Sequence, residues 1–289
     1  METSLRHACV RLEAVARRVC ADFEPPKPVA SANACDWLDV LLHLSFAIEQ
    51  ALTVDGFVPD EYDELVAVLD GVRADGASID EMLGHDHAEL LRWRRGAIHY
   101  AAASTWVGAP VGLDEAAEAA RCAAAAREQP RFIPACEAGA DVLQELIACA
   151  AQRHADAERT HPPEPALSSG FAEDDASAHG APGVRSGGSP VEGGTAGELL
   201  RMGVRSDAHV LALMYAADML FWRHCCAASA AAIQTPEVQA EPRAGGDWRE
   251  RSLQCARAFI VVVTELLPQH VGWERGRADE LVRRLSRAR

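Results

Sequence analysis

Lysine is almost absent from this chain of 289 residues, which carries a single lysine, Lys27, among 28 basic side chains. Forty-three acidic side chains outnumber the basic ones, and the formal net charge is −15. General binding to DNA or RNA depends on neutralising phosphates, so this balance argues against a nucleic-acid-binding protein. The preference for arginine over lysine is typical of a GC-rich genome and does not indicate a nucleic-acid surface.

Long apolar runs are missing too. The longest strongly apolar run, 258–263, is far shorter than the roughly 20 residues that a membrane-spanning helix needs. The first ten residues lack the apolar segment of a signal peptide. The nine cysteines are odd in number and include no Cys-x-x-Cys pair, as is typical of reduced intracellular proteins. We therefore expect a soluble, cytoplasmic protein.

Recognisable catalytic and metal-binding motifs are missing as well. There is no Gly-x-Ser-x-Gly motif, and the paired glycines near 190 do not follow a strand as a phosphate loop requires. His85 and His87 are a poor metal pair, because helical residues two apart point in different directions. Asp207 and His209 have the same spacing, so we do not assign them as a catalytic dyad. We predict no catalytic residue, no metal and no cofactor.

Apolar residues recur at helical spacing along most of the chain, and no alternating strand pattern is present. The fold we predict is all-α, a bundle or irregular array of about eight to ten helices. We expect Pro130 and Pro134 to interrupt the chain before one of these helices. The expected helices are 5–21, 34–54, 59–69, 85–107, 114–127, 136–153, 206–222, 248–267 and 273–287.

The chain divides by composition into three parts. Residues 1–156 form an N-terminal helical block, and residues 196–289 form a C-terminal helical block. Between them, 157–195 is rich in Gly, Ser, Pro and Ala and has no apolar period, so we expect this insert to be disordered. We expect the two blocks to pack on each other as one domain.

The stretch from Ser206 to Trp222 is expected to be the central helix. Ser206 is a favourable N-cap, and Asp207 places a carboxylate in the first turn. Two adjacent apolar faces follow, which indicates burial on more than one side. Asp218 lies between Tyr215 and Trp222 on one of these faces. A buried acid needs a partner.

An arginine-rich helix supplies the partner that we expect. Gly96 lies inside its pattern, where glycine is unfavourable unless another helix approaches closely. We predict that Arg94 or Arg95 pairs with Asp218 across a contact between the two helices. A structural ion pair is the favoured interpretation, with a catalytic role as the alternative.

A protein-binding surface is the remaining possibility on the same helix. Arg92 and Arg95, with His99, are placed to face outward at the edge of the face formed by Trp93 and Tyr100. Arginine and aromatic side chains are frequent anchors of protein interfaces. Core packing remains the favoured interpretation for each aromatic residue taken singly.

One motif consists of Trp93–Gly96 followed by Ala97 and Tyr100, and the other of Ser206, Asp207 and His209 followed by Leu211, Ala212, Met214, Tyr215, Asp218, Met219 and Trp222. Together they resemble a known family, the Rab-7-interacting subunit of the Mon-1/Ccz-1 complex, the exchange factor that activates Rab-7 on late endosomes. Asp218 stands where the family tends to carry Glu, and the insert at 157–195 is not part of the family pattern. The residues that carry the resemblance are Trp93, Arg94, Arg95, Gly96, Ala97 and Tyr100, then Ser206, Asp207, His209, Tyr215, Asp218 and Trp222.

The resemblance implies a non-enzymatic adaptor that binds the Mon-1/Ccz-1 subunits and the Rab-7 GTPase. It further implies a role in late endosomal trafficking, autophagy and mitophagy, with recruitment of a cytoplasmic protein to late endosomes or mitochondria. Two alternatives stay open. The chain could be a helical scaffold with a different, lineage-specific partner, or an enzyme with a site built from Asp218, His209 and the Arg94–Arg95 pair.

Overall fold

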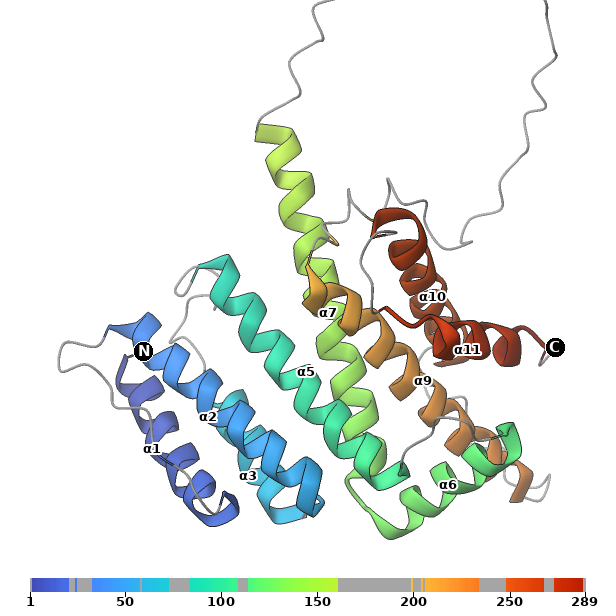
Figure 1. Ribbon diagram of the computed structural model, residues 1–289, viewed down its shortest axis with the longest axis horizontal. Helices are drawn as coiled ribbons and strands as arrows, with labels where there is room; N and C mark the ends of the chain where they lie inside the picture. Colours follow the sequence, from blue (N-terminus) through green and yellow to red (C-terminus); the bar gives the residue numbers. More distant parts are fainter. Residues whose placement is uncertain are drawn as a thin grey trace, which may run out of the picture.

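The computed structural model describes residues 2–20, 24, 33–57, 59–72, 84–108, 114–160, 199, 204, 206–233, 248–267 and 273–287. Within this part of the chain the fold is all-α and contains no strand, as predicted (Figure 1). Its helices are α1 (Glu2–Val19), α2 (Ala34–Asp55), α3 (Pro59–Asp70), α5 (His85–Val107), α6 (Glu115–Glu128), α7 (Phe132–Thr160), α9 (Asp207–Ile233), α10 (Trp248–Val261) with a π-helical turn (Val262–Leu266), and α11 (Gly276–Arg287).

Local sequence explains where several helices begin and end. The side chain of Asn33 accepts hydrogen bonds from the first turn of α2, and Asp36 accepts one in return from the Asn33 N–H, which is a capping box. Gly56 ends α2 with φ 94°, and Gly108 ends α5 with φ 71°. Glycine adopts this left-handed backbone without the steric cost that a Cβ atom would bring.

Helix α7 differs from the prediction at both ends. We expected Pro134 to break the chain and the helix to begin at 136, but α7 begins at Phe132 and includes Pro134 in its first turn. The first turn of a helix has N–H groups without intrahelical partners, so a proline there removes no bond. The helix extends to Thr160, into the first residues of the predicted insert; the rest of 157–195 lies outside the described residues.

Two apolar cores lie on opposite sides of α5. The N-terminal core consists of α1, α2, α3 and one face of α5, to which Ile98 and Ala102 belong. The C-terminal core consists of α6, α7, α9, α10, α11 and the other face of α5, with Ala103 and Val107. In Figure 1 the blue N-terminal helices lie on one side of α5, and the red and orange C-terminal ones lie on the other. Helix α5 therefore joins the two cores, and the division between them falls inside the predicted N-terminal block 1–156, because α6 and most of α7 belong to the C-terminal core.

Gly96 allows the close helix contact that its position predicted. A Cβ atom added there would lie 2.2 Å from Cδ2 of Leu143 on α7. Gly139 on α7 acts in the same way, because its added Cβ would lie 2.6 Å from the Cβ of His99 and 2.7 Å from the sulfur of Met219. Glycine on each of the two helices thus permits α5 and α7 to pack closely.

Helix α9 is central, as predicted, and continues well beyond Trp222 to Ile233. It packs against α5, α6, α7, α10 and α11. In Figure 1 it crosses the molecule between α7 and the red C-terminal helices. Its two adjacent apolar faces are both covered, which is the arrangement expected of a helix that is apolar nearly all round.

Helix α2 has the length and mean hydropathy to cross a membrane, although its longest uninterrupted apolar runs are short. The core helix of a globular domain has the same composition. In α2 the apolar residues Leu38, Leu41, Leu44, Ile48 and Leu52 are buried against α1 and α5, at the spacing of one helix face. We interpret α2 as a core helix of the N-terminal block.

Candidate functional site

Aromatic side chains from α5 and α9 form a continuous stack between the two helices. The ring of Trp93 lies 5.6 Å from that of Tyr215, centroid to centroid, and Tyr215 stacks on Tyr100 at 3.7 Å. Tyr100 in turn lies 5.7 Å from Trp222, which is fully buried. The aromatic residues that carry the family resemblance therefore occupy one connected contact between α5 and α9.

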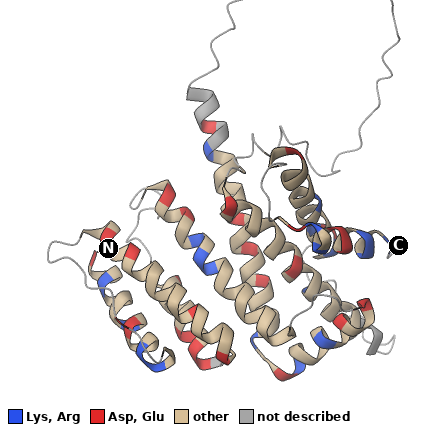
Figure 2. Ribbon diagram, in the orientation of Figure 1, with Lys and Arg blue, Asp and Glu red and all other residues tan. Residues whose placement is uncertain are grey.

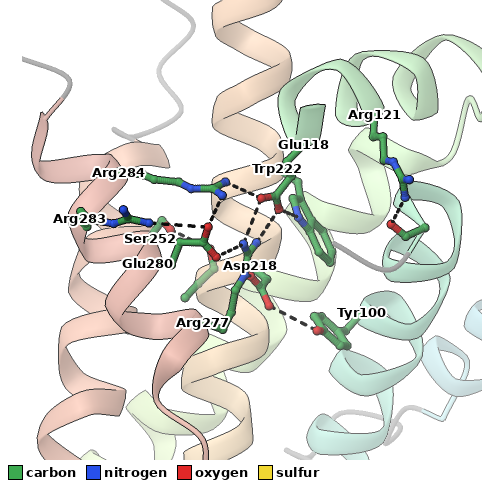
Figure 3. Close-up of polar contacts among 12 residues, drawn as sticks. Tyr100, Glu118, Arg121, Asp218, Trp222, Ser252, Arg277, Glu280, Arg283 and Arg284 are labelled. Carbon is green, nitrogen blue, oxygen red and sulfur yellow. Dashed lines mark hydrogen bonds and ion pairs between the residues drawn. The ribbon is translucent and has the colours of Figure 1, made fainter. Parts of the chain in front are cut away.

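Asp218 lies beside Tyr100 of this stack, and its cation is not the one we predicted. Its Oδ1 accepts a hydrogen bond from Nε of Arg277 on α11 at 2.7 Å. Its Oδ2 accepts one from the hydroxyl of Tyr100 at 3.3 Å (Figure 3). Burial raises the pKa of Asp218 above its ordinary value, and the charge of Arg277 opposes that rise.

The predicted pairing of Asp218 with Arg94 or Arg95 is wrong. Arg94 pairs with Glu49 on α2 at 2.5 Å, and Arg95 pairs with Asp70 on α3 at 2.5 Å. Successive helical residues are rotated by about 100°, so Tyr100 lies some 140° round the helix from Arg95 and 120° from Arg94. Both arginines therefore point toward the helices of the N-terminal core, away from α9.

Glu118 on α6 was missed by sequence reasoning and is the centre of the buried charge. It is fully buried, and it accepts hydrogen bonds from Nη2 of Arg277 at 2.6 Å and Nη1 of Arg284 at 2.6 Å. The indole N–H of Trp222 donates to it at 3.1 Å. The Glu118 cluster, drawn in Figure 3, consists of Glu118, Asp218, Arg277, Glu280 and Arg284.

A signal for Glu118 was present in the sequence. It is followed at positions +4 and +7 by Cys122 and Ala125, both buried on the same face of α6. An acid inside an apolar stripe is unusual and indicates a buried ion pair. Most of the apolar residues of 114–127 are alanines, whose small side chains mark an apolar face only weakly, so the acid does not stand out in the sequence.

The geometry suits the Glu118 cluster for joining helices. The two arginines face the two buried carboxylates, Glu118 of α6 and Asp218 of α9, so each buried carboxylate has a cationic partner. Glu280 of α11, which is partly exposed, contacts both arginines as well. Burial alone would lower the pKa of Arg277, but Asp218 and Glu118 raise it above its ordinary value. The guanidinium group of Arg277 therefore remains charged, and its ion pairs, with those of Arg284, hold α11 against α6 and α9.

His209 joins the start of α9 to α5. The hydroxyl of Ser206 lies 2.8 Å from its Nδ1, and Oε1 of Glu89 lies 2.8 Å from its Nε2. Glu89 also contacts Arg153 of α7. Burial lowers the pKa of His209, with Glu89 opposing that shift. Asp207, the other half of the dyad we declined to assign, is exposed in the first turn.

The expectation that His99 faces outward beside Arg92 and Arg95 is wrong. His99 is 4% exposed, and the hydroxyl of Tyr62 on α3 lies 2.6 Å from its Nδ1. Burial lowers the pKa of His99 to about 4, so the imidazole is neutral at pH 7. Arg92 contacts Glu145 on α7 at 3.1 Å. The polar side chains on this face of α5 thus contact other helices of the protein.

The nine cysteines are unbridged, and six of them are buried. Burial raises the pKa of the Cys9 thiol to about 12 and that of Cys226 to about 11. Among the described residues, no group of three or more His, Cys, Asp or Glu side chains is placed to hold a metal ion. The Cys9 and Cys226 thiols are therefore protonated at pH 7, whereas nucleophilic or redox chemistry requires the thiolate.

Comparison of the chain with family models, with curated proteins and with solved structures finds no match.

Proposed function

We propose that this protein is a non-enzymatic helical adaptor, and that it serves the Mon-1/Ccz-1 exchange factor and Rab-7, the partners of the family that it resembles. One observation carries the proposal. The motif residues Trp93, Tyr100, Tyr215 and Trp222 lie far apart in the sequence in two groups, yet their rings stack in one series. Residues that interlock in this way are the ones that a shared fold would retain.

The residues that the enzyme alternative would combine in one site make separate contacts in the structure. Asp218 bonds to Arg277 and Tyr100, His209 lies between Ser206 and Glu89, and Arg94 bonds to Glu49. A catalytic acid and base must meet near one substrate, and these groups serve separate helix contacts. The arrangement supports an adaptor more than an enzyme.

The proposal is tested by affinity purification of the tagged full-length protein from its own cells, followed by mass spectrometry. We expect both large exchange-factor subunits in near-stoichiometric amounts, and Rab-7 with them. Deleting 157–195 should leave this recovery unchanged, because the insert is not part of the family pattern. Absence of both subunits, from a protein that is folded by circular dichroism, would overturn the proposal.

The variant Glu118→Ala, which we expect to be destabilised, tests whether binding of the subunits depends on the fold. If the adaptor surface needs both helical blocks docked, this variant should lose the subunits in proportion to its unfolded fraction. Near-stoichiometric recovery of a different protein in place of the exchange-factor subunits would instead support a scaffold with a lineage-specific partner.

A further inference from the structure

Two adjoining hollows lie along the face of α5 that neither core covers. The larger, of about 360 Å³, is bounded by α2 on one side and by Tyr215 of α9 on the other. The smaller, of about 270 Å³, lies beside the N-terminal turns of α5 and α9. Both are lined by Trp93. We name the two together the α5 groove, which runs from Asp86 to Thr105.

Apolar side chains are exposed in both hollows of this groove. Phe46 on α2 is 50% exposed and lines the larger hollow, and Leu90 on α5 is 45% exposed and lines the smaller one. Trp93, which is half-buried, lines both. A single exposed apolar residue is ordinary, but a row of them along a hollow marks an interaction surface.

The dimensions of the groove are those of a helix. Its floor is the α5 stripe from Leu90 to Thr105, which spans about 22 Å at 1.5 Å per residue, or four helical turns. Its walls are two further helices, α2 and α9. A partner helix lying in such a groove would place apolar side chains at positions i, i+3 or i+4, and i+7 into the two hollows.

The charge of the groove favours a basic partner. Asp86 is exposed and lines its N-terminal end, and Asp207 is exposed nearby at the start of α9. Glu89 lines the same end, but it is already in contact with Arg153 and His209. Figure 2 shows acidic residues at that end of α5. The arginine in the floor, Arg94, is bound to Glu49, so it adds no uncompensated positive charge. An acidic rim on a chain with a net charge of −15 attracts cations and repels anionic surfaces.

We propose that the α5 groove binds an amphipathic helix of a partner protein, with apolar residues in the hollows and Lys or Arg against Asp86 and Asp207. This inference rests on the adaptor function proposed above and names the part of the surface that does the binding. The other conceivable occupants, a lipid surface or a second copy of the chain, are outcomes of the following test.

The test places a photo-crosslinking phenylalanine at position 46, and at Val10 on α1 as a matched exposed control. The full chain is irradiated in an extract of its own cells, and the crosslinked peptides are sequenced. We expect position 46, and not position 10, to give one peptide with apolar residues three and four apart and with Lys or Arg at one end. Equal crosslinking at the two positions, or crosslinks to lipid or to the chain itself, would overturn the proposal.

Binding of the synthetic crosslinked peptide then tests the chemistry of the groove by fluorescence anisotropy. Phe46→Ala combined with Leu90→Ala should weaken binding at least tenfold, whereas Val10→Ala should leave it unchanged. Asp86→Lys should weaken binding about fivefold at low salt, and Glu128→Lys, the same charge change on α6, should not. Equal effects of the groove and control variants would contradict binding of the peptide in the α5 groove.

Failure of the groove can be told apart from failure of the adaptor function. If the exchange-factor subunits still co-purify while crosslinking from position 46 equals that from position 10, the adaptor function stands and binding occurs elsewhere. If the subunits are absent but position 46 captures a basic amphipathic helix, the groove stands and the partner is a different one.

Discussion

The two cores on either side of α5 differ in what they bury. The N-terminal core encloses mainly aliphatic side chains, with the neutral pair of Tyr62 and His99 and with an ion pair between Arg94 and Glu49 whose side chains are 10% and 14% exposed. The C-terminal core encloses the charged Glu118 cluster. Apolar contacts are non-directional and bring helices together, whereas hydrogen-bonded charges have required directions. We infer that the charges determine where α11 docks.

Removing the central carboxylate should have the largest effect. Glu118→Ala takes away the fully buried partner of Arg277 and Arg284, so we expect a loss of about 3–5 kcal/mol in the free energy of unfolding, measured by urea denaturation. Glu128→Ala, an exposed acid on the same helix, should change it by less than about 0.5 kcal/mol. A loss below about 1 kcal/mol for Glu118→Ala would show that buried charge does not distinguish the C-terminal core from the N-terminal one.

Acid should destabilise the N-terminal core through His99. Its pKa is about 4 when folded and about 6.5 when unfolded, so the unfolded chain binds the proton first. The contribution is fully present above pH 6.5 and is lost as the pH falls toward 4. Between pH 7 and 4.5 the wild type should lose about 2–3 kcal/mol more than His99→Gln. Equal losses in the two proteins would contradict the assigned burial.

Closing the space between α5 and α7 should affect both cores. Gly96→Ala puts a Cβ 2.2 Å from Leu143, which is itself fully buried, so we expect a loss of about 1–3 kcal/mol and a lower melting temperature. Gly276→Ala, in α11 where the added Cβ meets nothing within 4 Å, should leave the melting temperature unchanged or raise it. A neutral Gly96→Ala would mean that Leu143 can move aside.

The helix caps should contribute alike in the two regions. Asn33→Ala at α2 and Ser206→Ala at α9 should each reduce the unfolding free energy by about 1 kcal/mol, because each leaves a first-turn N–H without its side-chain acceptor. Urea denaturation of the two variants in parallel measures this. If either variant loses as much as Glu118→Ala, buried charge is not what distinguishes the cores.

Helix positions could be predicted well from the sequence, because each depends on neighbours in the chain. The limits of α5, 85–107, follow from its apolar period and from the glycine at 108 that ends it. The start of α7 was missed because a proline that breaks a helix in its interior is tolerated in its first turn.

Only part of the candidate site could be predicted from the sequence. That Asp218 is buried and needs a cation could be inferred from the apolar residues around it on α9. That the cation is Arg277, 59 residues further on, could not, because the periodicity of one helix says which face is covered and not by what. Glu118 was hidden for the same reason, since its partners lie on α9 and α11.

The sequence by itself determined the all-α class, the central helix α9, the close approach at Gly96 and the burial of Asp218, because backbone propensity and side-chain period act over a few residues. Tertiary structure alone decided which arginines meet which acids. Arg94 and Arg95 pair with acids on α2 and α3 of the N-terminal core, and Arg277 pairs with the buried Asp218. The physical reason is rotation: about 100° per residue directs neighbouring side chains of one helix to different partners.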